Sequence, residues 1–326
     1  MSAAGAPATA GPGTVTVGPA TAADRPALAE LARAAGVPAP APERTWAARG
    51  PAGGILGFLT ERRAPGGGRD RPLLEAPVVH LPATALGPDR LALLLLRRAL
   101  GTAEGAHSGV ALARREPAPA AGAGPRARVH APDRLLAQEG WEPWLHRLEL
   151  HHPLTLAAPP AGMRFASFRP SREPTFAGLY RASFRGSLDR AAAAVAADPD
   201  ADWAALRRGA GREAWRSWFC LEDPVRGAVG LCCLTATGTS GGWCVQYLGV
   251  VPSARGRGYG RWLAEEAVRR AATQGAPELT LEVDRENTPA LGAYRAAGFA
   301  IRHPVTVFAA RGRAGVPARG GRDEPG

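Results

Sequence analysis

The apolar and polar positions of this 326-residue chain predict strands and helices in alternation, most clearly in its second half. The short apolar runs typical of strands there are 164–169, 215–223, 227–237, 243–251, 278–284 and 299–309. The segments with helical spacing or helix-forming composition are 175–184, an Ala-rich stretch that ends near Arg208, 260–275 and 288–298. This alternation predicts an α/β fold.

The first half repeats the same order of elements in a weaker form. Its expected strands are 15–17, 53–63, 72–83, 108–115 and 144–152, and its expected helices are 21–36, 91–100 and 133–141. A tandem duplication is the economical explanation. We therefore expect one domain at 14–155 and a second at 160–311, with disordered ends at 1–13 and 312–326 that are rich in Gly, Pro, Ala and Arg.

Composition narrows the possible partners and the compartment. The formal net charge of +11 suits an anionic ligand, but the arginines are scattered among acids, so a nucleic-acid partner is not expected. No apolar run reaches the roughly 20 residues of a membrane span, and the N-terminus lacks a signal-peptide pattern. The four cysteines, which include the adjacent Cys232 and Cys233, form neither a disulfide framework nor a metal knuckle. We expect a soluble cytoplasmic protein with no metal site and no membrane partner.

A glycine-rich loop between an apolar strand and an amphipathic helix gives the strongest chemical signal. It reads RGRGYG at 255–260. Its glycines let the main chain turn tightly and bring successive N–H groups close to a bound anion, and the helix that begins near Tyr259 adds unpaired N–H groups and a positive dipole end. The loop therefore predicts a pyrophosphate site. A P-loop is excluded because the chain has no lysine, and a dinucleotide-binding fold would place this turn after its first strand.

This loop resembles the R/Q-x-x-G-x-G/A motif of the GNAT acetyltransferases, with Arg255, Gly258 and Gly260 at the motif positions. Downstream, the sequence LTLEVDRENTPALGAYRAAGF is similar to a second pattern of that family, a strand followed by N-x-x-A-x-x-x-Y-x-x-x-G-F. The residues in register are Asn287, Ala290, Tyr294, Gly298 and Phe299. Because two motifs in the right order are more specific than one, residues 160–311 are identified as a catalytic GNAT-like domain with a mixed central sheet flanked by helices.

The resemblance implies an N-acetyltransferase that uses acetyl-CoA as co-substrate and acetylates a primary amine of a small molecule or peptide by direct attack. Main-chain groups of residues 248–250 would pair with the pantetheine arm, and residues 256–261 would hold the pyrophosphate. Asn287 would bond the cofactor or cap the helix that follows it. The expected cofactor-binding residues are Leu248, Gly249, Val250, Arg255, Gly256, Arg257, Gly258, Tyr259, Gly260, Arg261 and Asn287.

Acetyl transfer to an amine needs a proton acceptor for the amine and a proton donor for the departing thiolate. Glu282 is the candidate base, because some family members carry a catalytic glutamate on this strand five residues before the motif asparagine; otherwise it is a surface strand residue. Tyr294 is the candidate acid, although its position also suits an aromatic that packs the helix on the sheet. Gln246 and Tyr247 occupy the strand on which many relatives carry a glutamate, and neither is acidic, which favours Glu282 or a water chain as base.

Other polar and aromatic residues are expected to be structural. Glu222 and Asp223 are expected in a solvated hairpin turn, and His303 at the surface. The aromatic stretch is expected mainly in the core, with one or two members free to line an acceptor pocket. Its members are Trp203, Trp215, Trp218, Phe219 and Trp243.

The first half has no counterpart of the glycine loop. At the corresponding place only Gly87 is a glycine, and Pro88 removes a donor. The domain at 14–155 is therefore interpreted as a degenerate GNAT-like domain that supports the fold or shapes the acceptor cleft. The alternatives are a non-catalytic CoA-binding or sensing module, an acyltransferase with a longer acyl donor or a hydroxyl acceptor, and, more distantly, a nucleic-acid-binding protein.

Overall fold

A computed structural model describes most of the second half of the chain and parts of the first half. The described residues are 15–35, 40, 42–50, 52–63, 72–75, 78–80, 92, 95–96, 111–115, 127–129, 136–137, 141–154, 163–192, 198–237 and 242–310. The expected disordered ends and most of the expected helices at 91–100 and 133–141 lie outside them. No helix in these ranges is long and apolar enough to cross a lipid bilayer.

The chain divides into two compact units, and the first is drawn from residues 1–141. Its described elements are β1 (Thr16–Pro19), α1 (Arg25–Ala35), β2 (Thr45–Arg49), β3 (Ile55–Arg63), β5 (Val78–His80) and β7 (Ala127–Val129), with short 3-10 turns at Ala22–Asp24 and Pro42–Arg44. Strands β1, β2 and β3 form an antiparallel sheet, and β5 pairs with both β3 and β7. Helix α1 packs Leu28 and Leu31 against Ala47 and Phe58, as the shared helical face of the two leucines predicts.

The second unit holds the larger sheet and consists of 142–326 with two segments of the first half, 63–73 and 108–116. Its strands are β6 (Ala111–Arg115), β8 (Trp141–His152), β9 (Arg164–Ser167), β10 (Phe219–Asp223), β11 (Gly227–Thr237), β12 (Gly242–Val250), β13 (Leu279–Asp284) and β14 (Ala300–Ala310). Its helices are α4 (Glu173–Ser183), α6 (Pro199–Trp215), α7 (Tyr259–Thr273) and α8 (Thr288–Ala296), with 3-10 turns at Pro170–Arg172 and Pro252–Ala254. A further strand, β4 (Pro72–Glu75), falls across the division between the units.

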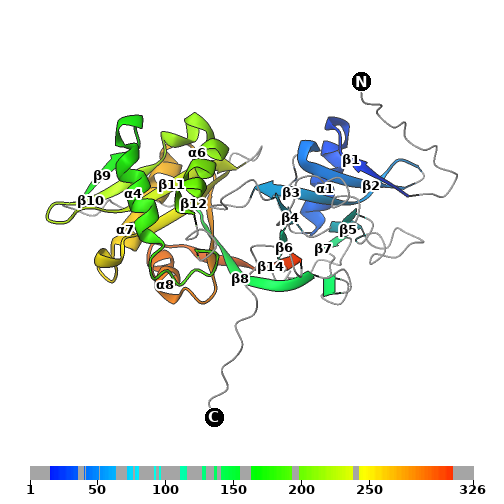
Figure 1. Cartoon of the computed structure of the whole chain (residues 1–326). Coiled ribbons are helices and arrows are strands. Elements are labelled where there is room, and N and C mark those ends of the chain that lie inside the picture. The colour runs from blue at the N-terminus through cyan, green and yellow to red at the C-terminus, as the bar shows by residue number, and fades with distance from the viewer. Residues whose placement is uncertain are drawn as a thin grey trace, which may run out of the picture. The chain divides into compact units, whose positions relative to one another are not determined.

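The strands of the second unit follow the order β6-β14-β8-β13-β12-β11-β10-β9, and β12 and β13 run parallel within a largely antiparallel sheet. Helices cover both of its faces (Figure 1). Along β11, Cys232 and Leu234 belong to the core beneath α7 and α8, whereas Leu231 and Cys233 belong to the core beneath α4 and α6. Since successive side chains of a strand point to opposite faces, this alternation places the two helix pairs on opposite sides of the sheet. The mixed α/β fold expected from the sequence is confirmed.

Strand β8 joins the sheet of the second unit. Its residues 147–152 pair antiparallel with β13, so that Arg147 lies opposite Asp284 and His152 opposite Leu279. The sequence placed this strand at the end of the first domain, 14–155, because alternating apolar residues identify a strand but not its partner. The strand on the other side of β8 is β14.

Two strands approach each other closely at Gly230, which lies opposite Val250 in the β11–β12 pair. A Cβ at this position would lie 2.6 Å from the main-chain oxygen of Gly249 and 2.9 Å from Leu263 Cδ1. Because that oxygen cannot move without disturbing the strand pairing, Gly230→Ala is expected to lower the free energy of unfolding by about 1–3 kcal/mol in urea titrations.

The matched control for this substitution is Gly178→Ala in α4, where a Cβ would meet no atom within 4 Å. There the exchange is expected to raise stability by about 0.5–1 kcal/mol, because alanine favours the helix. A Gly230→Ala protein as stable as the parent would contradict the close strand approach.

Candidate active site

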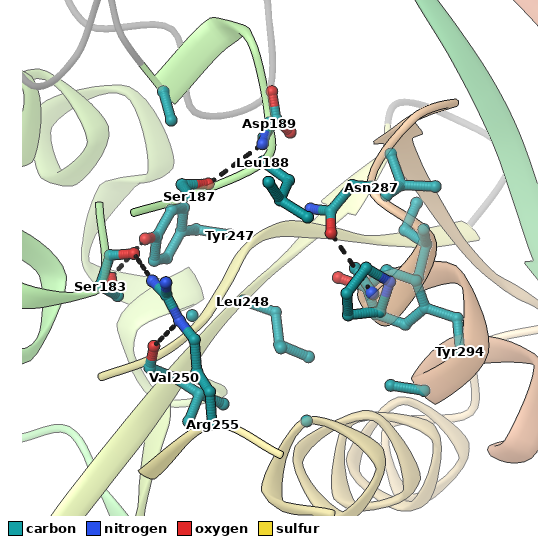
Figure 2. A pocket seen from close by; sticks show the side chains of 18 of the residues that line it. Ser183, Ser187, Leu188, Asp189, Tyr247, Leu248, Val250, Arg255, Asn287 and Tyr294 are labelled. Carbon is teal, nitrogen blue, oxygen red and sulfur yellow. Dashed lines mark hydrogen bonds between the residues drawn. The ribbon is translucent and has the colours of Figure 1, made fainter. Parts of the chain in front are cut away.

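The candidate site lies where two parallel strands separate. Residues of β12 and β13 are paired only at Trp243–Leu279 and Cys244–Thr280. Beyond Cys244, β12 continues to pair with β11 on its other side. A cavity of about 610 Å³ lies at this separation and is lined by both strands, by the loop after β12 and by α8 (Figure 2). Main-chain groups of residues 248–250 therefore border a space large enough for a ligand.

A β-bulge accompanies this separation. Cys233 of β11 pairs with Tyr247 and Leu234 with Val245, so Gln246 is the extra residue on β12. A bulge bends its strand and increases the local twist. Since it follows closely on the last pair with β13, it turns β12 away from that strand.

Strand β12 also contacts the end of α4 at the cavity. The hydroxyls of Tyr247 and Ser183 are 2.5 Å apart, and Ser183 Oγ donates to the main-chain oxygen of Tyr180 at 2.7 Å. A Cβ at Gly249 would lie 2.6 Å from Ser183 Oγ and 2.7 Å from Tyr247 Oη. Glycine at 249 is therefore required by this contact, while Leu248 lines the cavity (Figure 2).

The glycine-rich loop has the conformation expected of an anion site. Gly256 and Gly258 adopt φ values of +75° and +83°, and α7 begins at the next residue, Tyr259. Within the described part of the chain, no hydrogen bond occupies the N–H groups of Gly256, Arg257 or Gly258. The first turn of α7, through Arg261, adds N–H groups that a helix leaves unpaired. All residues of 256–261 except Arg257 line the cavity.

The side chain of Arg255 forms hydrogen bonds with main-chain oxygens of the protein. Its guanidinium donates to the main-chain oxygens of Ser183 and Gly186, both at 2.7 Å, and of Val250 at 3.2 Å (Figure 2). These bonds tie the loop to the end of α4. Arg255 lines the cavity, but its guanidinium serves to position the loop, so a direct cofactor contact by this side chain stays a prediction.

The buried carboxylate of Asp223 accepts a hydrogen bond from Tyr259, the first residue of α7. Tyr259 Oη donates to Asp223 Oδ2 at 2.5 Å, and Asp223 Oδ1 accepts the N–H groups of Val225 and Arg226. The tyrosine hydroxyl and these N–H groups hold the pKa of Asp223 below its usual value. The expectation of a solvated turn was wrong for Asp223, because the sequence indicated the turn but not its partner on α7. Glu222 is partly exposed, and its carboxylate pairs with Arg172 at 2.5 Å.

The candidate base, Glu282, lies on the cavity wall. Leu281 and Val283 belong to the core beneath α7 and α8, so strand alternation turns Glu282 to the other face. Its side chain is only 8% exposed, which excludes the surface interpretation. Arg147 of β8 approaches it twice: Nη2 donates to the main-chain oxygen of Glu282 at 2.9 Å, and Nε lies 3.7 Å from Oε2.

The candidate acid, Tyr294, reaches the same cavity from α8. Its ring packs against Phe299 with centroids 5.9 Å apart, and it also lines the cavity, on a different side from Arg255 (Figure 2). Burial raises the pKa of Tyr294 above its ordinary value, so the phenol remains protonated at neutral pH. Tyr294 therefore both packs against Phe299 and lines the cavity.

Asn287 starts the helix that carries Tyr294. Its Oδ1 accepts the N–H of Ala290 at 3.3 Å, which caps α8, and the residue lines the cavity (Figure 2). The capping role expected from the sequence is confirmed, whereas the bond to a cofactor stays a prediction.

Two charged cavity residues were missed by the sequence analysis. Arg147 comes from β8, and Asp189 comes from the segment after α4, where its Oδ2 lies 3.6 Å from Arg147 Nη2. No motif surrounds either residue. The available signal was the polar face of the strand 144–152, on which Arg147, Glu149 and His151 alternate with leucines.

The aromatic stretch lies away from this cavity. Trp203, on α6, and Trp218 are buried in the core between these helices and the sheet, and no tryptophan of the stretch lines the cavity described above. The expectation that the stretch is mainly core is confirmed. His303 on β14 was expected at the surface, which was wrong: it is 7% exposed, because β14 packs within the sheet.

A family comparison agrees with this geometry. Residues 179–299 match the model of the Acetyltransferase (GNAT) family, and this range runs from within α4 to just past α8. The matched segment contains the glycine loop, Glu282 and Tyr294.

Comparison with curated proteins finds similarity to mycothiol and streptothricin acetyltransferases. A mycothiol acetyltransferase of Thermobifida fusca is 35% identical over 104 residues, which is 32% of this chain and 30% of the relative. A streptothricin acetyltransferase of Streptomyces lavendulae is 45% identical over 57 residues, which is 18% of this chain and 30% of the relative. The matched part thus spans less than a third of each relative.

Solved structures resemble the fold over a longer range. A GCN5-related N-acetyltransferase from Sphaerobacter thermophilus aligns with a TM-score of 0.61 at 18% identity, covering 90% of this chain and 95% of that one. A tandem GNAT protein from the clavulanic acid biosynthesis pathway aligns with a TM-score of 0.52 at 16% identity, covering 91% and 98%. At these identities the likeness concerns the fold.

Substitution of Gly258 tests the anion loop. Because φ is +83° there, Gly258→Ala strains the backbone that presents the N–H groups, at a cost of about 1–2 kcal/mol. We expect the affinity for acetyl-CoA, measured by isothermal titration, to fall about tenfold or more.

The control is Gly275→Ala, whose φ is +72° and whose added Cβ would also meet no atom within 4 Å. It should lose similar stability in thermal unfolding yet keep the parent affinity, because Gly275 does not line the cavity. Equal affinity losses for both variants would mean that the loop has no special relation to the ligand.

Proposed function

We propose that this protein is an acetyl-CoA-dependent N-acetyltransferase that acetylates a primary amine by direct attack in a ternary complex. One observation carries the proposal: a single cavity borders the open edge of β12, the start of α7, the buried carboxylate of Glu282 and the protonated phenol of Tyr294. This supports a binding site for the acetyl donor next to two groups that can transfer protons.

The residues of the cavity fit acetyl-CoA. The N–H groups of 256–261 would take the pyrophosphate, and the main chain of 248–250 would pair with the pantetheine arm. Added Cβ atoms at Gly256 and Gly258 would meet no protein atom within 4 Å, so the space beside these amides is open. When bound, acetyl-CoA supplies an acetyl group activated as a thioester.

The two side chains have separate tasks in the transfer. The carboxylate of Glu282 accepts the proton that the amine loses, directly or through water, as nitrogen bonds to the acetyl carbon. As the carbon–sulfur bond breaks, Tyr294 Oη gives its proton to the sulfur. The raised pKa of Tyr294 keeps that proton in place at neutral and moderately alkaline pH.

A small molecule is the favoured acceptor. Both curated relatives are named for acetyltransferases of small molecules, and Asp189 adds a second carboxylate that suits a cationic amine near Glu282. We place this chemistry in the second domain, 160–311, and retain 14–155 as a degenerate GNAT-like domain, an arrangement that the tandem GNAT neighbour also favours. The cytoplasm, where acetyl-CoA is available, is the proposed location.

Release of free CoA in the presence of amine panels tests the function. The panels are antibiotics with amino groups, polyamines, amino sugars and short peptides, each assayed with acetyl-CoA and with longer acyl-CoA donors. We expect CoA release together with an acetylated amine in the mass spectrum for at least one panel. Tight binding of acetyl-CoA without product in any panel would favour a CoA-binding module, and faster turnover of a longer donor would replace acetyl as the group transferred.

Removal of the Tyr294 hydroxyl tests the assignment of this residue as the general acid. Tyr294→Phe is expected to lower kcat about 100-fold or more with little change in acetyl-CoA affinity, because a general acid contributes to the chemical step. The parent rate should show no loss through deprotonation of Tyr294 below about pH 10, since burial moves that deprotonation above its ordinary range. Tyr247→Phe is the comparison, and if it lowers kcat more than Tyr294→Phe does, the acid has been misassigned.

A further inference from the structure

A ladder of charged residues crosses β8 and β13 beside the candidate base. Arg147 lies opposite Asp284, and Glu149 lies opposite Glu282. Directly opposite residues of an antiparallel pair project to the same face of the sheet and interact. Glu149 is 6% and Asp284 2% exposed, and the Glu282 side chain is 8% exposed. The face therefore places three buried carboxylates close together.

Arg147 is a cation within this group. Its side chain is 16% exposed, and it approaches Asp189 at 3.6 Å and Glu282 at 3.7 Å, besides donating to the Glu282 main chain. Both carboxylate distances are those of ion pairs rather than hydrogen bonds. A buried guanidinium requires such carboxylates, and they in turn require it, because an uncompensated buried charge is costly.

Charged groups near Glu282 come from several elements. Glu149 opposes it across the strands, Asp189 reaches Arg147 from the segment after α4, and Arg302 of β14 lies 4.0 Å from Glu149. Asp284 accepts N–H groups of Arg190 and Glu286, and Tyr294 on α8 is neutral. Within the part of the chain that the structure describes, Arg147 pairs with Glu282, and the neighbouring carboxylates Glu149 and Asp284 carry the same charge as Glu282.

We propose that Arg147 is a positioning residue for the transfer. It holds Glu282 ionised on the cavity wall and links it to Asp189, the second carboxylate that suits a cationic amine. Arg147 lies on β8, outside the family-matched residues 179–299, so the site is completed by a strand that precedes them. This inference rests on the proposed function, in which Glu282 is the base.

Titration of the Glu282 carboxyl in the full chain tests the electrostatic part directly. The protein is labelled with ¹³C at glutamate side-chain carboxyls, and the Glu282 signal is identified by its loss in Glu282→Gln. We expect Arg147→Met to raise the titration midpoint of Glu282 by about one pH unit or more, because an opposite charge at this distance favours the ionised form. Arg147→Lys should restore most of the difference.

Two further variants provide a control and a shift of the Glu282 midpoint in the opposite direction. Arg285→Met removes an exposed positive charge one residue beyond β13 and should leave the midpoint unchanged. Glu149→Gln removes the opposing carboxylate and should lower the midpoint, which keeps the ladder testable if Arg147→Met does not fold. An unmoved midpoint in folded Arg147→Met protein overturns the inference.

Kinetics then separates this inference from the proposed function. With benzylamine as acceptor probe, the acidic limb of the pH profile of kcat/KM should move with the midpoint in Arg147→Met, while acetyl-CoA affinity stays at the parent value. A residue that only supports the fold would lower activity without moving the limb. If Glu282→Gln retains the parent activity, the base of the proposed function is wrong; if Glu282→Gln is inactive but the Arg147→Met limb stays in place, the inference alone fails.

Discussion

The separation of β12 from β13 after two residue pairs is the constraint on which the rest of the site depends. A buried strand edge carries N–H and C=O groups that need partners, and a neighbouring strand does not supply them along this stretch. The bulge at Gln246 bends the strand outward, and the contact of Gly249 with Ser183 fixes its other side. The open edge is thus built into the fold, and an extended ligand arm can complete the pairing that β13 leaves unfinished.

This separation also explains how groups from opposite sides of a sheet share one cavity. Glu282 projects to the face beneath α4, whereas Tyr294 belongs to the helix layer on the other face. In a continuous sheet the backbone would stand between them. Because the sheet is interrupted, Glu282 and Tyr294 line the same cavity from opposite sides of the sheet.

Local chemistry made some features predictable and tertiary pairing hid others. The loop at 256–260 and the cap at Asn287 follow from φ values and hydrogen bonds within a few residues, so sequence patterns identified them. Asp223 and His303 were misjudged because their burial depends on α7 and on the sheet order, which no local pattern encodes. Arg147 escaped notice for the same reason, since its neighbour Glu282 lies far along the chain.

Strand β8 has a consequence for how this architecture can diverge. If residues 160–311 were transferred to another protein without it, β13 would become an edge strand whose backbone groups could pair with another molecule. The motifs would be inherited intact, yet the recipient would face self-association. The folding unit is therefore longer than the segment that carries the motifs, because β13 needs β8 as its neighbour.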